Sequence, residues 1–257
     1  MKRKTNKGPS AEVEQGIRKL ATVGGRHAYM YDSLKASGII ALESRLERTA
    51  VQLADVDPNV RRVVAQPFTL DVETGQIFTT REALQTAREA RKKTEATKRD
   101  YTPDFNFGLV WREVAVEAKD ERFFGDAEYW KKVERAAHIL RTAGRGFAVV
   151  CFSRKELDAL EWNAAVLTSF RHTATESLTP RGVDAIADCL AHGERPLAEV
   201  LKAAGLSVRT SPGLFLDGVL RADLKSNRIS TNLIVELAHG DLSSLSLLPF
   251  EPGLLAP

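Results

Sequence analysis

The sequence has few cysteines and histidines and no long apolar run. Its two cysteines, Cys151 and Cys189, are too few for a disulfide scaffold, which favours a reducing, cytoplasmic location. The five histidines are scattered and never pair with a cysteine at zinc-ligand spacing, so we expect no structural zinc site. The longest apolar run, residues 146–152, is too short to span a bilayer, and no apolar signal segment follows the basic N-terminus. We therefore expect a protein without membrane association.

The charge balance does not indicate a nucleic-acid partner by itself, because 37 basic residues face 34 acidic ones in 257 residues. Charge is uneven along the chain, however. Between Arg81 and Arg99 there are seven basic residues against three acidic ones. Such a stretch can neutralise DNA phosphates, or it can be the solvated face of a helix. The sequence supports the two interpretations about equally.

Apolar periodicity predicts an α/β core followed by a helical part. Helices are expected at 41–54, 81–98 and 126–141, and β-structure at 61–71, 77–78, 101–105, 108–111, 114–118 and 147–152. This order predicts a mixed sheet flanked by helices. After residue 153 the sequence pattern changes and predicts helices at 154–170, 180–191 and 196–204. We expect a basic arm at 1–30, a core domain at 31–155, a second domain at 156–240 and a tail at 241–257 that either docks a partner or packs back on its own domain.

Polar residues at the ends of two predicted strands form the candidate site. Asp104 follows Pro103 at the start of one strand, and Glu117 and Lys119 lie two residues apart near the end of the next. Residues i and i+2 of a strand point to the same face, so Glu117 and Lys119 project together and Ala118 points away. Alone, each motif is usually a turn residue or a solvated pair. The apolar residues around both motifs favour a functional site.

This residue set suits the hydrolysis of a phosphodiester bond. That reaction needs an activated water molecule and neutralisation of the charge on phosphate. Magnesium supplies both and prefers oxygen ligands such as converging carboxylates. A lysine beside them can orient the water and offset the anionic phosphate. The sequence therefore predicts a magnesium-dependent nuclease if the two strands pair.

A longer pattern carries a family resemblance. Pro103-Asp104 and Glu117-Ala118-Lys119 resemble the PD-(D/E)xK nuclease signature, which is weak by itself. The wider order is more specific: Glu43-Ser-Arg-Leu-Glu47, Asp57-Pro-x-Val60, Gln66-Pro-Phe68, Tyr101-Thr-Pro-Asp-Phe105 and Val116-Glu-Ala-Lys119. In that order the chain resembles TnsA, the endonuclease subunit of heteromeric bacterial transposases of the Tn-seven kind, over residues 30–155. The resemblance implies a restriction-endonuclease-like mixed sheet. The charged segment before Tyr101 departs from the shorter hairpin of many members, which puts the local topology in doubt.

The resemblance also implies roles for the site residues. Asp104 would bridge two Mg²⁺ ions, with Glu47 binding one and Glu117 the other, and Mn²⁺ would substitute. Lys119 would position the attacking water. Glu43 lies one helical turn before Glu47 and is the alternative acidic ligand, but the family pattern favours Glu47, with Glu43 as a helix-start residue. Proteins of this family cut the 5′ ends of a transposon, while an integrase-like transposase, TnsB, cuts and joins the 3′ ends.

The second domain reads as winged-helix-like. A helix ending at Gly205, a second helix from Ser207 cut short at Pro212, and a hairpin after Val219 give that arrangement. The alternative is a small packing domain. Basic residues are sparse here, which favours docking to a TnsC-like ATPase regulator over strong binding of double-stranded DNA. We expect core packing, and not base stacking, for the three tryptophans Trp111, Trp130 and Trp162.

Two other functions remain open. One is a stand-alone restriction or repair nuclease of the same fold, which would cut DNA without a partner. The other is a non-catalytic adaptor that binds DNA or protein through a nuclease-like fold. The complete set of Glu47, Asp104, Glu117 and Lys119 argues against the adaptor.

Overall fold

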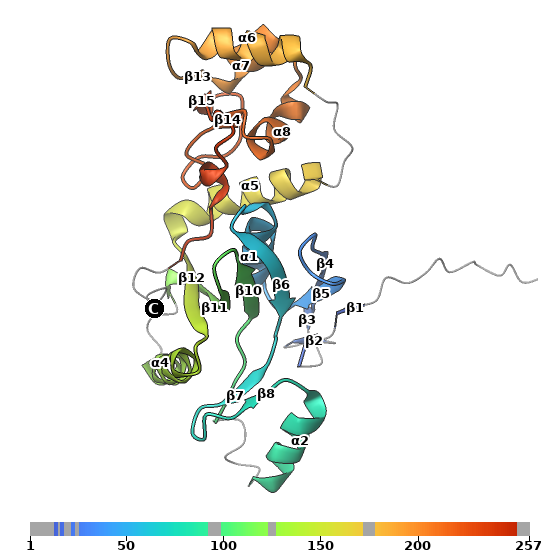
Figure 1. Ribbon diagram of the computed structural model, residues 1–257, viewed down its shortest axis with the longest axis vertical. Helices are drawn as coiled ribbons and strands as arrows, with labels where there is room; N and C mark the ends of the chain where they lie inside the picture. Colours follow the sequence, from blue (N-terminus) through green and yellow to red (C-terminus); the bar gives the residue numbers. More distant parts are fainter. Residues whose placement is uncertain are drawn as a thin grey trace, which may run out of the picture.

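The computed structural model describes residues 13–14, 16–17, 22–23, 26–91, 99–122, 127–171 and 178–250 (Figure 1). The strands up to the first long helix are β1 (Val13–Glu14), β2 (Thr22–Val23), β3 (Arg26–His27), β4 (Tyr29–Asp32) and β5 (Ile39–Leu42). The core continues with α1 (Arg45–Val56), β6 (Val60–Ala65), β7 (Thr69–Asp71), β8 (Ile77–Phe78), α2 (Arg81–Ala90), β9 (Asp100–Tyr101), β10 (Phe105–Leu109), β11 (Glu113–Asp120), α4 (Ala127–Thr142) and β12 (Gly146–Phe152). The last part holds α5 (Arg154–Arg171), α6 (Pro180–Leu190), β13 (Arg195–Pro196), α7 (Leu197–Ala204), α8 (Ser211–Leu216), β14 (Leu220–Arg221) and β15 (Ile234–Leu237).

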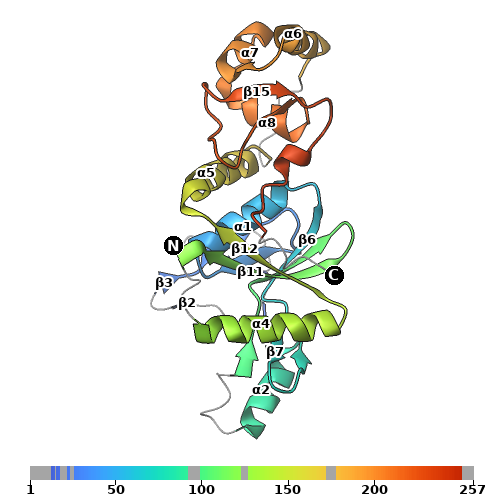
Figure 2. The same ribbon diagram turned by 90° about the vertical axis from the view of Figure 1, so that its left-hand side faces the viewer.

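A four-stranded mixed sheet in the order β12-β11-β10-β6 forms the centre of the fold. Strand β11 is parallel to β12, while β10 is antiparallel to both β11 and β6. Helix α4 covers one face and α1 the other, and α5 packs on α1 as a further layer (Figure 2). Alternate residues of each strand supply two separate apolar cores, one on each face. The predicted α/β class with a mixed sheet flanked by helices is confirmed.

The first long helix begins later than predicted. Residues 39–42 form β5 instead of the expected first turn at 41, and α1 begins at Arg45. The backbone N–H of Glu47 donates to the Ser44 side chain at 3.1 Å, which makes Ser44 the N-cap. The prediction of a helix from residue 41 was therefore wrong. The apolar spacing of the helix extends back to residue 41, but the Ser44 cap sets the start of α1 at Arg45.

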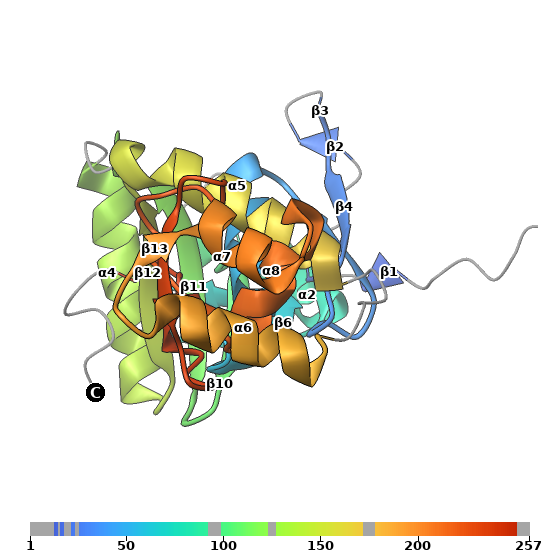
Figure 3. The same cartoon turned by 90° about the horizontal axis from the view of Figure 1, so that it is seen from above.

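The predicted arm at 1–30 lies partly outside the described residues, which omit 1–12. Within the described part, β1 runs parallel to β5, and β2 pairs with β3 in a small hairpin. In Figure 3 the strands β2, β3 and β4 lie on the side of the molecule away from α4. Some residues of the predicted arm thus belong to strands of the fold.

Two of the three tryptophans do not pack in a core. Trp130 packs against the core under α4 as expected. Trp111 is 63% exposed in the turn between β10 and β11, and Trp162 is 47% exposed on α5. The indole N–H of Trp162 donates to the Ile229 carbonyl at 3.2 Å, and the Arg228 guanidinium lies 5.3 Å from its ring centre. The core prediction was wrong for Trp111 and Trp162. For Trp111, apolar spacing does not show which residues after a strand form the turn; Trp162 lies on the exposed side of helix α5.

The C-terminal part has the order α6, β13, α7, α8, β14, β15, and its three strands pair as β13-β15-β14. Helix α7 ends at Gly205, whose φ of 67° is the left-handed conformation expected of a C-cap glycine. The sequence predicted that Pro212 would end the next helix. Instead, Pro212 lies in the first turn of α8. Proline is tolerated there because the first N–H groups of a helix have no intrahelical partner. In Figure 3 the helices α6, α7 and α8 lie over α5.

Residues 241–250 return from the C-terminal part to the central sheet. The Cys151 N–H of edge strand β12 donates to the Pro249 carbonyl at 2.9 Å, and Phe250 bridges to Val150. Leu245, Leu247 and Leu248 are buried in the core on the α1 side. The first ten residues of the predicted tail therefore pack within the fold, and residues 251–257 lie outside the described residues.

Both cysteines are free thiols, with Cys151 buried in β12 as expected and Cys189 half-buried in α6. In the described ranges, no helix combines the length and apolar character that crossing a bilayer requires.

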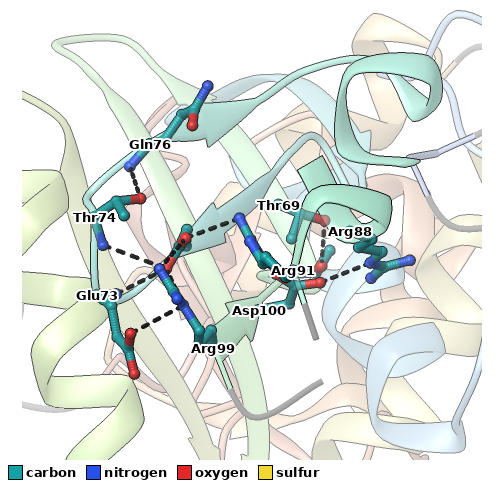
Figure 4. A network of polar contacts seen from close by, with 10 residues as sticks. Thr69, Glu73, Thr74, Gln76, Arg88, Arg91, Arg99 and Asp100 are labelled. Atoms are coloured by element: carbon teal, nitrogen blue, oxygen red, sulfur yellow. Dashed lines mark hydrogen bonds and ion pairs between the residues drawn. The ribbon is translucent and has the colours of Figure 1, made fainter. Parts of the chain in front are cut away.

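A lobe of β7, β8, β9 and α2 projects from the sheet and is held by a network of ion pairs (Figures 1 and 4). Arg88 and Arg91 each bind Asp100 at 2.7 Å. Arg91 and Arg99 bind Asp71 at 2.8 and 2.9 Å. These pairs join α2 and the segment before β9 to the strands β7 and β9.

This network bears on the basic stretch at 81–99. Its arginines Arg88, Arg91 and Arg99 are paired with carboxylates inside the lobe, and Arg81 donates to the carbonyls of Gly16 and Ile17. An arginine already neutralised in the fold contributes less to binding phosphate. The structure thus favours a structural role for these four arginines, while Lys92, Lys93 and Lys98 lie outside the described residues.

Asp71 lies at the centre of the network and is 1% exposed. Burial by itself raises the pKa of a carboxyl, but hydrogen bonds from Arg99, Glu73 and Thr74 outweigh it and lower the pKa of Asp71 from 3.8 to about 2. The unfolded chain then binds the proton more tightly than the folded protein. The stabilisation is fully present above pH 4 and is lost as the pH falls through the interval from about 4 to about 2.

We predict that Asp71→Asn lowers the free energy of unfolding by about 2 kcal/mol at pH 7, as the pKa difference implies. The difference from wild type should shrink toward zero as the pH falls to 2. Urea unfolding followed by circular dichroism from pH 7 to pH 2 measures this. Glu73→Gln removes the half-exposed partner of the same Arg99 and should cost less than about 1 kcal/mol. A constant gap between Asp71→Asn and wild type across this range would contradict the assignment.

Candidate active site

Asp104 and Glu117 face each other across two paired strands. The β10–β11 register places Phe105 opposite Val116, so Asp104 comes opposite Glu117 at the end of the ladder. The Ala118 N–H donates to Asp104 Oδ2 at 2.9 Å and fixes that carboxylate. Val116 and Ala118 lie in the core on the α1 side, while Glu117 contacts Tyr129 of α4 on the other. The strand pairing on which the predicted site depends is therefore present.

Glu47 reaches the same place from the N-terminus of α1. Its Oε2 accepts the Glu43 N–H at 2.9 Å, and its Oε1 accepts the Ser44 hydroxyl at 2.9 Å. Glu47 is only 7% exposed. A glutamate in the third helical position commonly bonds back to the capping residue in this way. Glu47 therefore has a capping role in addition to any role in the site.

Glu43 is also close but is not on the helix, contrary to the sequence prediction of a helix-start residue. It precedes the N-cap, and its Oε1 accepts a hydrogen bond from the Gln66 side-chain amide at 2.8 Å. Gln66 is 3% exposed and has a φ of 44°, a left-handed conformation that costs energy for a non-glycine residue. Its N–H donates to the Asp104 carbonyl at 2.8 Å. Gln66 thus ties the segment of Glu43 to the segment of Asp104.

All four predicted site residues line one cavity of about 580 Å³. Glu47 comes from α1, Asp104 from the start of β10, and Glu117 and Lys119 from β11. Cationic side chains of α2 and α4 also line it, namely Arg88 and Lys132. Residues far apart in the sequence therefore line one cavity, and Arg88 lies in its wall beside its ion-pair partner Asp100.

Glu117 accepts hydrogen bonds on both of its carboxylate oxygens and is 3% exposed. Tyr101 donates its hydroxyl to Oε2 at 2.8 Å, and Tyr129 donates its hydroxyl to Oε1. Lys119 Nζ lies 2.7 Å from the same Oε1 and 4.8 Å from the centre of the Tyr129 ring. Three donors thus bind the two oxygens of one buried carboxylate.

The electrostatics show crowding of negative charge. Burial raises the pKa of Asp104 well above its ordinary value, and the charges of Glu117 and Glu47 raise it further. Burial would lower the pKa of Lys119, but the negative charges of Glu117 and Asp104 outweigh this and raise it. Lys119 is therefore protonated at neutral pH and acts as a positive charge, not as a proton acceptor.

The donor set fits a divalent cation in kind. Glu47, Asp104 and Glu117 offer the hard oxygens that Mg²⁺ prefers, and a cation would relieve the repulsion that raises the pKa of Asp104. Asp104 Oδ1 accepts no hydrogen bond within the described part of the chain. However, no group of three or more His, Cys, Asp or Glu among the described residues is arranged closely enough to hold a metal. A cation here would require the carboxylates to exchange some of their present partners.

Sequence reasoning missed four residues of the site region: Gln66, Tyr101, Tyr129 and Lys132. Gln66 and Tyr101 belong to the motifs Gln66-Pro-Phe68 and Tyr101-Thr-Pro-Asp-Phe105, so their motifs were noticed without a role. Tyr129 and Lys132 lie in the first turns of α4, where helical periodicity gives no sign of a site. Only the packing of α4 on the sheet brings them to Glu117 and its cavity.

Comparison with protein-family models gave no match, and comparison with curated proteins gave none either.

We predict that Asp104→Asn stabilises the protein in the absence of divalent cations. The substitution removes one charge from a crowded, buried acidic set while keeping an oxygen for the Ala118 N–H, and its gain in unfolding free energy should be about 1 kcal/mol at pH 8. A raised native pKa means that stability falls as the pH rises above 3.8, so the gain should grow with pH. Urea unfolding in a chelator at pH 5 and pH 8 measures it.

Asp120→Asn, at the end of the neighbouring strand β11, is the matched control. Asp120 is buried, but Arg122 lowers its pKa, so removing its charge should destabilise the protein. If both asparagine variants lost stability equally, Asp104 would be an ordinary structural carboxylate.

Proposed function

We propose that the chain is a magnesium-dependent DNA endonuclease of the TnsA kind, which cleaves the 5′ ends of a transposon beside an integrase-like transposase. The observation that carries this is the meeting of Glu47, Asp104, Glu117 and Lys119 in one cavity at the end of the β10–β11 pair. An acidic set of this kind with one protonated lysine suits an anionic ester that is brought together with a divalent cation. Such work would place the protein in the bacterial cytoplasm.

The residues divide the work as follows. Glu47, Asp104 and Glu117 would hold Mg²⁺, with Mn²⁺ as a substitute, and Asp104 would be the shared ligand. When bound, the metal would lower the pKa of a water molecule and neutralise charge on the phosphate. Lys119, protonated and 24% exposed at its side chain, would orient the attacking water and offset the phosphate charge. The cavity-lining Lys132 would contact a neighbouring phosphate.

The fold supports the proposal at a coarser level. A mixed sheet with an acidic residue on a preceding helix and a carboxylate–lysine pair on a strand suits a restriction-endonuclease-like domain. The C-terminal order of helix, strand, two helices and two strands suits a winged-helix-like domain. That domain would contact DNA or dock a TnsC-like ATPase, and its sparse basic residues favour docking.

A stand-alone restriction or repair nuclease is the second candidate, because the cavity would serve it equally well. A non-catalytic adaptor is less suited, since the crowding of the buried Glu47 and Glu117 around Asp104 raises the pKa of Asp104 and costs stability without a divalent cation. Partner dependence separates the two enzyme proposals.

We predict that Asp104→Ala abolishes DNA cleavage, by at least about a hundredfold, while the protein still folds. The variant removes the carboxylate common to both expected metal positions. Cleavage of end-labelled transposon DNA in Mg²⁺, with circular dichroism as the folding check, measures this. Glu113→Gln is the control: Glu113 is an exposed acid at the start of the neighbouring strand β11, is paired with Arg62 outside the cavity, and should keep full activity. Full activity of Asp104→Ala would reject the site.

The same labelled DNA tests the role in transposition. Incubation with the integrase-like transposase should produce cuts at the 5′ ends that are absent when this chain is omitted. Efficient cutting by this chain alone would favour the stand-alone nuclease.

A further inference from the structure

One oxygen of Glu117, Oε1, has as many partners as its lone pairs can accept. An ionised carboxylate offers about four lone-pair positions on two oxygens. Here Tyr129 and Lys119 both bind Oε1, and Tyr101 binds Oε2. A cation at Oε1 would therefore meet an oxygen whose lone pairs are already used.

The two phenols are held differently. Tyr101 is 4% exposed on β9, and its ring packs near Phe147 with ring centres 6.3 Å apart. Tyr129 is half-buried in the first turn of α4 and packs edge-on against Trp130, and both tyrosines line the cavity. Tyr101 is thus fixed within the core beneath α4, while Tyr129 lies where the helix begins and solvent is near.

We propose that the Tyr129 hydroxyl is a placeholder on Glu117 Oε1 that a divalent cation displaces, while Tyr101 is a positioning residue that keeps Glu117 oriented throughout. This rests on the proposed magnesium-dependent function. It accounts for a site whose acidic residues share one cavity and yet form no ready-made metal-holding group among the described residues. The hydroxyl would keep the buried charge of Glu117 satisfied until metal arrives, because an unpaired buried charge is costly.

The proposal predicts opposite effects from two identical chemical changes. Tyr129→Phe removes the competing donor and should tighten divalent-cation binding about tenfold, since a hydrogen bond to a charged group is lost only from the metal-free state. Tyr101→Phe removes the orienting donor and should weaken binding about tenfold, as loss of a group that orients a metal ligand does. Calorimetric titration of the full chain with Mn²⁺, and then with Mg²⁺, measures both dissociation constants.

Two controls accompany these variants. Tyr31→Phe removes a phenol that donates to the buried carboxylate of Asp55 at 2.8 Å, and neither residue lines the cavity, so its affinity should match wild type. Asp104→Asn should abolish the binding. Binding that survives Asp104→Asn, or no binding by wild type, would reject the proposed metal site itself. If cation binding depends on Asp104 but is unchanged or weakened in Tyr129→Phe, the metal site stands and only the role proposed for the Tyr129 hydroxyl is overturned.

A second measurement does not depend on the stability of Tyr129→Phe. The chain has four tyrosines, so labelling with 3-fluorotyrosine gives four ¹⁹F resonances. The variants Tyr29→Phe, Tyr31→Phe and Tyr101→Phe assign three of them, and the fourth belongs to Tyr129. Titration of wild type with Mg²⁺ should shift the Tyr129 resonance most and leave that of Tyr31 in place. A Tyr129 resonance that stays fixed while Mg²⁺ saturates the protein would also overturn the placeholder.

Discussion

The site depends on how the protein satisfies a buried carboxylate. Glu117 lies between the sheet and α4, where an unpaired charge would be costly. Each surrounding element supplies one donor: β9 supplies Tyr101, α4 supplies Tyr129, and β11 itself supplies Lys119. The backbone N–H of Ala118 does the same for Asp104. The elements around Glu117 thus satisfy its buried charge in the absence of a divalent cation, while Asp104 stays in a crowded acidic setting that raises its pKa.

The lobe contributes to the same arrangement. Asp100 and Tyr101 are adjacent on β9, so the ion pairs of Asp100 with Arg88 and Arg91 hold the strand that carries the Tyr101 phenol. Strand β9 also pairs with β7, where Asp71 binds Arg91 and Arg99. The positive charge of this segment therefore stabilises the wall of the cavity. That use accounts for a basic stretch whose described arginines are largely neutralised inside the protein.

The sequence predicted the features that depend on the alternation of residues along a strand and on the order of helices and strands along the chain. Alternation along residues 104–119 predicted that Glu117 and Lys119 project together from a strand, and the mixed sheet followed from the order of the elements. It failed where one side chain decides a boundary, as Ser44 does at the start of α1, and where a turn exposes Trp111. Tyr129 could not be predicted at all, because its role arises from the packing of α4 on the sheet. Gln66 was visible as a motif, but its left-handed backbone is known only from the fold.

The C-terminal part is joined to the site through α1. Helix α5 packs against both α1 and α8, and one apolar core runs continuously from the sheet into α6, α7 and α8. At the C-terminal end of α1, Ser246 of the returning segment binds Asn59 at 2.8 Å and Asp57 at 3.3 Å. At the other end of α1, Glu47 enters the cavity. The helix that carries Glu47 is therefore packed between the sheet and the C-terminal part, and one continuous apolar core includes both.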